Sequence, residues 1–197
     1  MNIKFYMLLL IAFFYSTLSF SKEEKMYIWE PNKYENKSVS HYTDTLYLSV
    51  IDDRELSEKS KINFSSEELV NYVFDVICKS FPNAKVISTN DEKICGDKVM
   101  FKIHIKVYCA IFNAKIAAKD LFLSPIITGG SSKWYGTTQY FVETIDDRKE
   151  KKDIIEFLGE DSKKNSMGYS TAKKVLTNSF QTATENMINY LILVTSL

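Results

Sequence analysis

The sequence predicts an α+β domain, a mostly antiparallel sheet with two helices packed on one face, in the order β-α-β-β-β-α. Residues 98–112 alternate apolar and polar side chains, and only a strand turns successive side chains to opposite faces. Residues 66–80 and 171–193 instead place apolar side chains three to four positions apart, which is the spacing of an amphipathic helix. The two periods together indicate helices packed on a sheet.

Residues 1–21 have the features of a secretory signal peptide. Lys4 supplies a positive start, residues 5–14 are apolar, and Ser19-Phe20-Ser21 forms a small-x-small cleavage site. An uncleaved membrane anchor is the alternative, but the apolar run is shorter than the roughly 20 residues that a span needs. We therefore expect a mature protein that is periplasmic or extracellular and not inserted in a membrane. No Cys adjoins the predicted cleavage point, so we expect no N-terminal lipid.

After the leader, we expect an extended arm over residues 22–44 and one α+β domain over residues 45–197. The arm is polar and aromatic without a sustained period, and 45% hydrophobic residues in the whole chain are enough for a core in the domain. The first strand is predicted at 45–51, with Leu46, Leu48 and Val50 on one face. It ends at the turn Asp52-Asp53-Arg54.

The helix predicted over residues 66–80 has the clearest start signal in the chain. Ser65 is placed to cap it, and Glu68 is placed to reach back to the Ser65 amide as a capping box. Phe64 and Leu69 stand at the positions of a hydrophobic staple. Pro82 ends the helix, and a short strand follows at 84–88.

The long strand predicted over residues 98–112 is the centre of the domain. At about 3.3 Å per residue it would run about 50 Å, so we expect it to be bent or bulged. One face is expected to lie in the core and the other to be polar, with Lys102, His104 and Lys106. The expected core face consists of Val99, Phe101, Ile103, Ile105, Val107, Cys109 and Ile111.

Two segments follow whose roles the sequence leaves open. Segment 119–133 is either a loop over the end of the core or a surface that binds a partner. A strand over 134–145 is expected to return antiparallel to the long one, and the charged residues up to 165 are read as a connector. Ser170 is expected to cap the last helix. The candidate partner-binding residues are Leu121, Phe122, Leu123, Ile126 and Ile127.

The sequence excludes several kinds of chemistry. His41 and His104 are the only histidines, and no ligand spacing typical of a metal site surrounds them. The six glycines form no phosphate-binding loop, so we expect neither metal nor cofactor. The chain has 25 basic and 25 acidic residues, and loss of Lys4 with the leader leaves a net charge of −1. A nucleic-acid partner is therefore not expected.

The paired acids Asp52-Asp53 and Asp146-Asp147 are candidates for acid/base chemistry if the strand ends meet. An Arg follows each pair, which favours local ion pairing and ionised carboxylates instead.

The three cysteines are Cys78, Cys95 and Cys109. A Cys78–Cys95 disulfide and free thiols both remain open, whereas Cys109 is expected to be a small buried side chain.

The order of elements resembles that of small envelope domains of the YajG-type lipoprotein family. The residues that carry the resemblance are TLYLSVIDDR at 45–54, the helix around VNYVFDVI at 70–77, and the last helix. The chain lacks the lipobox Cys of such proteins. The resemblance implies no catalytic residues. The first hypothesis is a non-catalytic envelope or secreted domain that binds another envelope protein or a glycan through the polar face of its sheet or segment 119–133. The alternative is a small hydrolase or ligand-binding enzyme that uses Asp52, Asp53 or His104.

Overall fold

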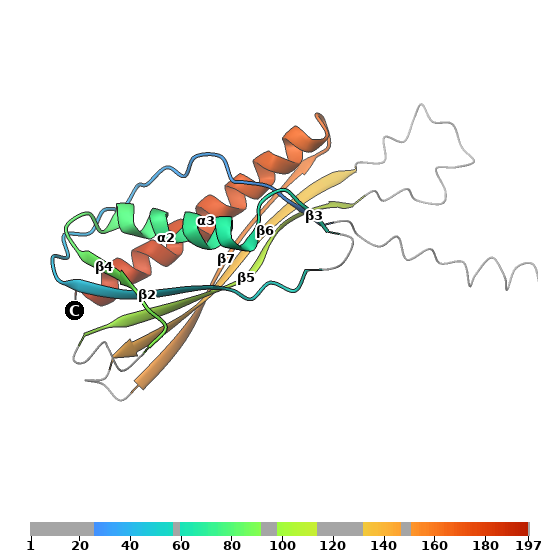
Figure 1. Cartoon of the computed structure of the whole chain (residues 1–197). Helices are drawn as coiled ribbons and strands as arrows, with labels where there is room; N and C mark the ends of the chain where they lie inside the picture. Colours follow the sequence, from blue (N-terminus) through green and yellow to red (C-terminus); the bar gives the residue numbers. More distant parts are fainter. Residues whose placement is uncertain (1–25, 57–59, 92–97, 114–131, 147–150, 197) are drawn as a thin grey trace, which may run out of the picture.

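The computed structural model describes residues 26–56, 60–91, 98–113, 132–146 and 151–196. Its strands form one sheet, and both helices lie on the same face of that sheet (Figure 1). The elements are β1 (Met26–Ile28), β2 (Thr45–Asp52), β3 (Lys61–Ile62), α2 (Ser66–Ser80), β4 (Lys85–Ser88), β5 (Met100–Asn113), β6 (Lys133–Asp146), β7 (Lys151–Lys164) and α3 (Tyr169–Thr195).

The sheet is mixed, so the prediction of a mostly antiparallel sheet was wrong. β1 and β6 pair with β5 in the antiparallel sense, and so does β7 with β6. By contrast, β2 is parallel to both β4 and β5, and β1 is parallel to β3. The parallel pairing of β2 with β4 follows from the crossover through α2, because a helix between two neighbouring strands returns the chain in the original direction.

The charged connector predicted before the last helix is in fact β7, paired with β6 from one end to the other. This strand lies at the edge of the sheet. Its outward side chains are exposed, including Ile154 at 66% and Leu158 at 44%, while Phe157 packs against the core. The high charge of the segment hid a strand, because edge strands carry charged side chains that discourage pairing with other molecules.

β5 contains the expected irregularity, a register shift against β6 between Ile105 and Val107. Before it, Phe101, Ile103 and Ile105 are fully buried, as predicted. After the register shift, Tyr108 and Ala110 enter the core and Val107 is only half-buried, although Cys109 is buried as predicted. An extra residue in one strand of a pair disturbs the alternation of the side chains that follow it. The prediction of one continuous apolar face therefore fails beyond Ile105.

The two helices begin in different ways. α2 has the predicted bounds and capping box: the Glu68 amide donates to Ser65 Oγ at 3.2 Å, and the Ser65 amide donates to Glu68 Oε2 at 2.7 Å. The predicted Ser170 cap of α3 was wrong, because α3 begins at Tyr169 after Gly168, which has φ of 55°. The Asn165 side chain accepts the Gly168 amide at 2.9 Å and sets this turn.

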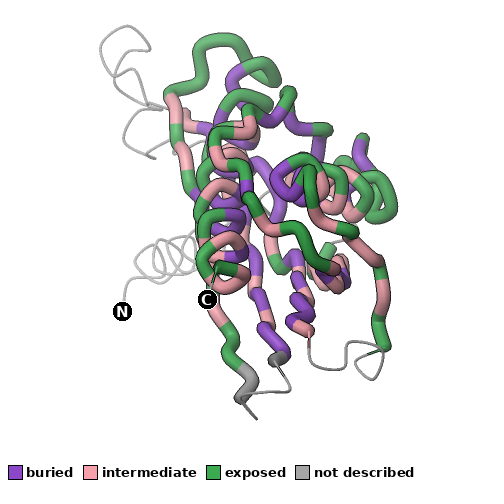
Figure 2. The backbone as a smooth tube through the Cα atoms, turned by 90° about the vertical axis from the view of Figure 1, so that its left-hand side faces the viewer, coloured by how far each residue is buried: buried purple, intermediate pink, exposed green. Residues whose placement is uncertain are grey.

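Two glycines allow α3 to pack closely on the sheet. A Cβ atom at Gly136 on β6 would overlap the Val175 carbonyl, and one at Gly159 on β7 would overlap the Ser179 carbonyl. The core between the sheet and the helices is continuous. Buried residues recur along β5, β6 and both helices, where one side of each element faces this core (Figure 2).

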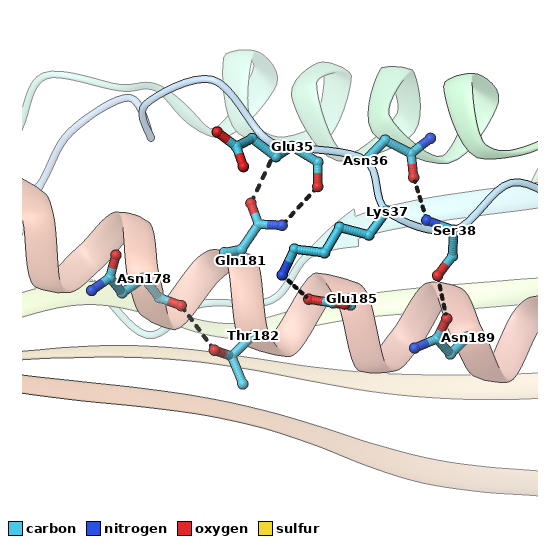
Figure 3. Close-up of polar contacts among 9 residues, drawn as sticks. All are labelled: Glu35, Asn36, Lys37, Ser38, Asn178, Gln181, Thr182, Glu185 and Asn189. Atoms are coloured by element: carbon cyan, nitrogen blue, oxygen red, sulfur yellow. Dashed lines mark hydrogen bonds and ion pairs between the residues drawn. The ribbon is translucent and has the colours of Figure 1, made fainter.

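The arm after β1 crosses the outer side of the helix layer (Figures 1 and 3). Gln181 on α3 holds its backbone twice, since its Oε1 accepts the Glu35 amide at 3.2 Å and its Nε2 donates to the Glu35 carbonyl at 2.8 Å. The Ser40 amide donates to the Ser80 carbonyl of α2 at 2.8 Å. Further contacts are Lys37 with Glu185 and Ser38 with Asn189.

Candidate functional site

The end of β2 places two neighbouring carboxylates on opposite faces of the sheet. Asp52 lies on the helix side, where its Oδ1 accepts Arg54 Nε at 2.7 Å and its Oδ2 accepts Arg54 Nη2 at 2.6 Å. The side chains of Asp52 and Arg54 are only 6% and 2% exposed. The Arg54 guanidinium also lies 6.0 Å from the centre of the Tyr108 ring. The predicted local ion pairing is confirmed here, and it is almost fully buried.

Asp53 lies on the other face and joins β2 to β5. Its Oδ2 is 2.7 Å from His104 Nδ1 and 3.0 Å from Lys106 Nζ. The structure thus brings together Asp53 and His104, which the sequence offered as separate candidates. Within the described ranges, no Ser, Thr or Cys side chain makes a hydrogen bond to His104. The cluster is therefore an acid–histidine pair without a nucleophile in contact.

The electrostatics of both acids favour the ionised carboxylate. Burial raises the pKa of Asp52, but hydrogen bonds from Arg54 and Ser66 outweigh it, so its pKa is lowered overall. The pKa of Asp53 is lowered mainly by the hydrogen bond from Lys106 and then by that from His104. At neutral pH neither group is a proton donor, and each carboxylate already accepts hydrogen bonds from its own neighbours.

The sheet has a gap beside this cluster. β2 pairs with β5 only as far as Ile105, where the Asp53 amide still donates to the Ile105 carbonyl at 3.0 Å. β1 begins its pairing with β5 at Ala110. On this side of β5, no strand in the described part of the chain pairs with residues Lys106–Cys109. The interruption coincides with the bulge.

A cleft of about 510 Å³ lies at the gap. It combines apolar side chains with charged and amide groups, a mixture typical of binding sites. Val107 and Phe141 contribute apolar surface, and Arg54 and Tyr108 form part of its lining through the gap. Cys109 also lines it, and burial raises the pKa of this thiol to about 11, so the sulfur remains protonated at neutral pH. The remaining lining residues are Met26, Asp53, Glu55, Leu56, Lys106 and Gln139.

Arg54 has one nitrogen that the fold leaves without an acceptor. Nε and Nη2 bind Asp52, but Nη1 is buried and has no hydrogen-bond partner among the residues that the structure describes. A buried donor without an acceptor is costly. This feature escaped the sequence reasoning, because the Ile-Asp-Asp-Arg turn indicated pairing within the turn and not what it would leave unpaired.

Several other residues that the sequence singled out are not among those that the structure describes. Leu121, Phe122, Leu123, Ile126 and Ile127 lie outside the described residues, as do Cys95 and Asp147. Over the described ranges, no three His, Cys, Asp or Glu side chains gather in a way that could hold a metal ion. Neither helix described in the structure is both long and apolar enough to cross a membrane.

Comparison with known proteins gives structural neighbours only. No protein-family model matches the sequence, and no curated protein is significantly similar to it. A Xanthomonas campestris protein of the DUF330 family matches with a TM-score of 0.53 at 8% identity, covering 87% of this chain and 96% of that chain. This likeness supports a shared fold and no more.

Two further matches have TM-scores too low to carry an argument. One is a Helicobacter pylori homologue of the neuraminyllactose-binding hemagglutinin, with a TM-score of 0.45, 6% identity, and coverage of 83% of this chain and 92% of that chain. The other is a minor lipoprotein from Acinetobacter baumannii, with a TM-score of 0.38, 9% identity, and coverage of 80% and 92%. The resemblance to YajG-type proteins stays a prediction.

Proposed function

We propose that this protein is exported and acts as a non-catalytic domain of the envelope or the extracellular space that binds a protein or glycan partner. The observation that carries the proposal is the cleft beside the β5 bulge, which mixes apolar, amide and charged groups on the polar face of the sheet. The leader at residues 1–21 supports export. The apolar residues of segment 119–133 remain a second proposed contact surface.

The state of the titratable groups supports binding over catalysis. Asp52 is held by Arg54, and Asp53 is held by His104 and Lys106. A carboxylate that is already neutralised by its neighbours has little basicity left for proton transfer. The protonated thiol of Cys109 is likewise a poor nucleophile.

Hydrolysis is the second candidate function, and one observation favours it. The 2.7 Å contact between Asp53 and His104 is the geometry by which an acid orients a histidine base. The test compares wild type with His104→Ala and Asp53→Ala on chromogenic esters, phosphates and glycosides. Asp52 is unsuitable for this test, because removing it would leave the Arg54 charge buried and unpaired. Turnover that His104→Ala abolishes, with the fold intact, would replace the binding proposal.

Photo-crosslinking in the producing cell tests the binding proposal directly. Benzoylphenylalanine is placed at Phe141, which lines the cleft, at Phe122 in the predicted segment, and at Tyr135 as the control. Tyr135 is a matched position because it lies on the same strand, does not line the cleft, and is 40% exposed. We expect discrete adducts in the envelope or medium fraction from position 141 and none from position 135.

The outcomes separate the two surfaces. Adducts from position 122 alone would keep the proposed function and move the contact to segment 119–133. Absence of adducts from both positions 141 and 122 would contradict partner binding.

A further inference from the structure

The unpaired edge of β5 at residues Lys106–Cys109 has room for one short strand among the described residues. β2 and β1 lie along the same side of β5, one on each side of residues Lys106–Cys109. At about 3.3 Å per residue this stretch is about 13 Å long, which matches roughly four residues of extended chain. On the other side of β5, Val107–Cys109 are paired with β6, which holds this part of the backbone in strand conformation, and Lys106 is the bulge residue. Such a stretch is ready to accept another strand.

A turn at Asp52–Arg54 carries the chain away from β5 directly after β2. The Arg54 amide donates to Asp52 Oδ1 at 3.2 Å. The main chain therefore leaves the ladder directly after Asp53, and Arg54, Glu55 and Leu56 line the cleft. The buried Asp52–Arg54 pair anchors this turn.

A buried hydrogen-bond donor of Arg54 is a second observation that points to a ligand in the cleft. Its side chain is only 2% exposed, it lines the cleft, and its Nη1 donor has no acceptor among the described residues. A strand inserted beside β5 would bring main-chain carbonyl oxygens to this part of the cleft. One such carbonyl would be an acceptor for this donor, which has none among the described residues.

We infer that the occupant of the cleft is an extended peptide segment of a partner protein, which adds a short strand to β5 at residues Lys106–Cys109. The inference rests on the proposed function and narrows its partner from a protein or glycan to a peptide. Main-chain hydrogen bonds supply the affinity in such an addition, and alternate side chains supply the specificity. Side chains on one face of the peptide would contact Met26, Val107 and Phe141, so we expect apolar residues at every second position.

The test begins with a displayed library of random seven-residue peptides selected on the purified exported protein. Selected peptides are synthesised with acetyl and amide ends, and their affinity is measured by fluorescence polarisation. Gln139→Trp fills the cleft, since Gln139 lines it. Ile154→Trp is the matched control on the neighbouring strand, where Ile154 is 66% exposed and does not line the cleft. We expect at least tenfold weaker binding to Gln139→Trp and unchanged binding to Ile154→Trp, with both melting temperatures near that of wild type.

Backbone methylation then separates strand addition from side-chain binding alone. N-methylation of single peptide amides removes one donor at a time. In a strand only alternate amides face β5, so methylation at every second amide should weaken binding about tenfold and methylation at the others much less. Equal effects at successive amides would overturn the inference, as would selected peptides that bind Gln139→Trp as tightly as wild type. A selection that returns no binding peptide would overturn it too.

Failure of this inference is distinguishable from failure of the proposed function. Crosslinking from position 141 without any peptide that shows the two-residue methylation period would refute strand addition and leave partner binding in place. Absence of such peptides together with absence of adducts from both positions 141 and 122 would refute both strand addition and partner binding.

Discussion

Asp52 and Arg54 form a bidentate ion pair that is almost fully buried at the point where β2 ends. Both carboxylate oxygens are used, and Oδ1 also accepts the Arg54 amide. The pair therefore ends the strand, starts the turn and shapes the cleft. A buried pair of this kind costs desolvation when it forms, but breaking it costs more, because the remaining charge stays buried.

Replacing one member of this pair should be strongly destabilising. Arg54→Met is expected to lower the free energy of unfolding by about 3–5 kcal/mol, measured by urea denaturation, because the Asp52 carboxylate loses its cation. The double variant Asp52→Asn, Arg54→Met should recover part of the loss. Lys37→Met is the control, since Lys37 is 58% exposed in its pair with Glu185 and should change stability by less than about 1 kcal/mol. Similar losses for Arg54→Met and Lys37→Met would contradict the assignment.

Stability should fall in acid through Asp52 and Asp53. The pKa of each is lowered below the ordinary value of 3.8 in the folded protein, so the folded state binds their protons less readily than the unfolded state. Their contribution is fully present above that ordinary value and is lost as the pH falls through the lowered pKa values. Urea midpoints measured from pH 7 down to about 2 should drop below about pH 4, and Asp52→Asn should show a shallower drop. An unchanged acid slope in Asp52→Asn would count against this explanation.

Close packing of α3 on the sheet makes two glycines sensitive to the addition of one methyl group. Gly136→Ala and Gly159→Ala should each lower the free energy of unfolding by about 1–3 kcal/mol or more, because the added Cβ meets rigid helix backbone. Thr137→Ala, on the opposite face of β6 from Gly136, is the control and should stay within about 0.5 kcal/mol. Thermal denaturation of the three variants tests this prediction. If Gly159→Ala left stability unchanged, α3 would lie further from β7 than the structure shows.

Because of the bulge in β5, the positions at which a smaller side chain destabilises the protein should differ before and after Ile105. Ile103→Ala should cost about 2–5 kcal/mol, since Ile103 is fully buried, whereas Lys102→Ala should stay within about 0.5 kcal/mol. Beyond the bulge, Tyr108→Phe should cost about 1–3 kcal/mol, because the Tyr108 hydroxyl donates to the buried Trp29 carbonyl at 2.6 Å. If Val107→Ala proved more damaging than Tyr108→Ala, the placement of Tyr108 in the core would be wrong.

Export can be checked by N-terminal sequencing. The secreted material should begin close to Lys22 and remain in solution without detergent, because the predicted leader is removed. Secreted protein that begins at Met1 would contradict cleavage.

Much of the fold follows from local signals in the sequence. α2 begins and ends where the capping box and Pro82 predict, because a helix start depends on residues within one turn of each other. β2 and the first half of β5 follow from the two-residue period, which one strand displays by itself. The ion pair of Asp52 with Arg54 was predictable for the same reason, since the two residues are two positions apart.

The tertiary structure decided whatever depends on a distant partner. Asp53 and His104 are 51 positions apart, and only the parallel pairing of β2 with β5 brings them together. The segment at β7 became a strand because β6 offered a free edge, although its charge favoured a connector. Pairing partners also set the bulge after Ile105 and the point where β2 leaves β5. The cleft arises from these non-local pairings, whereas the period and caps of a sequence report only on neighbours along the chain.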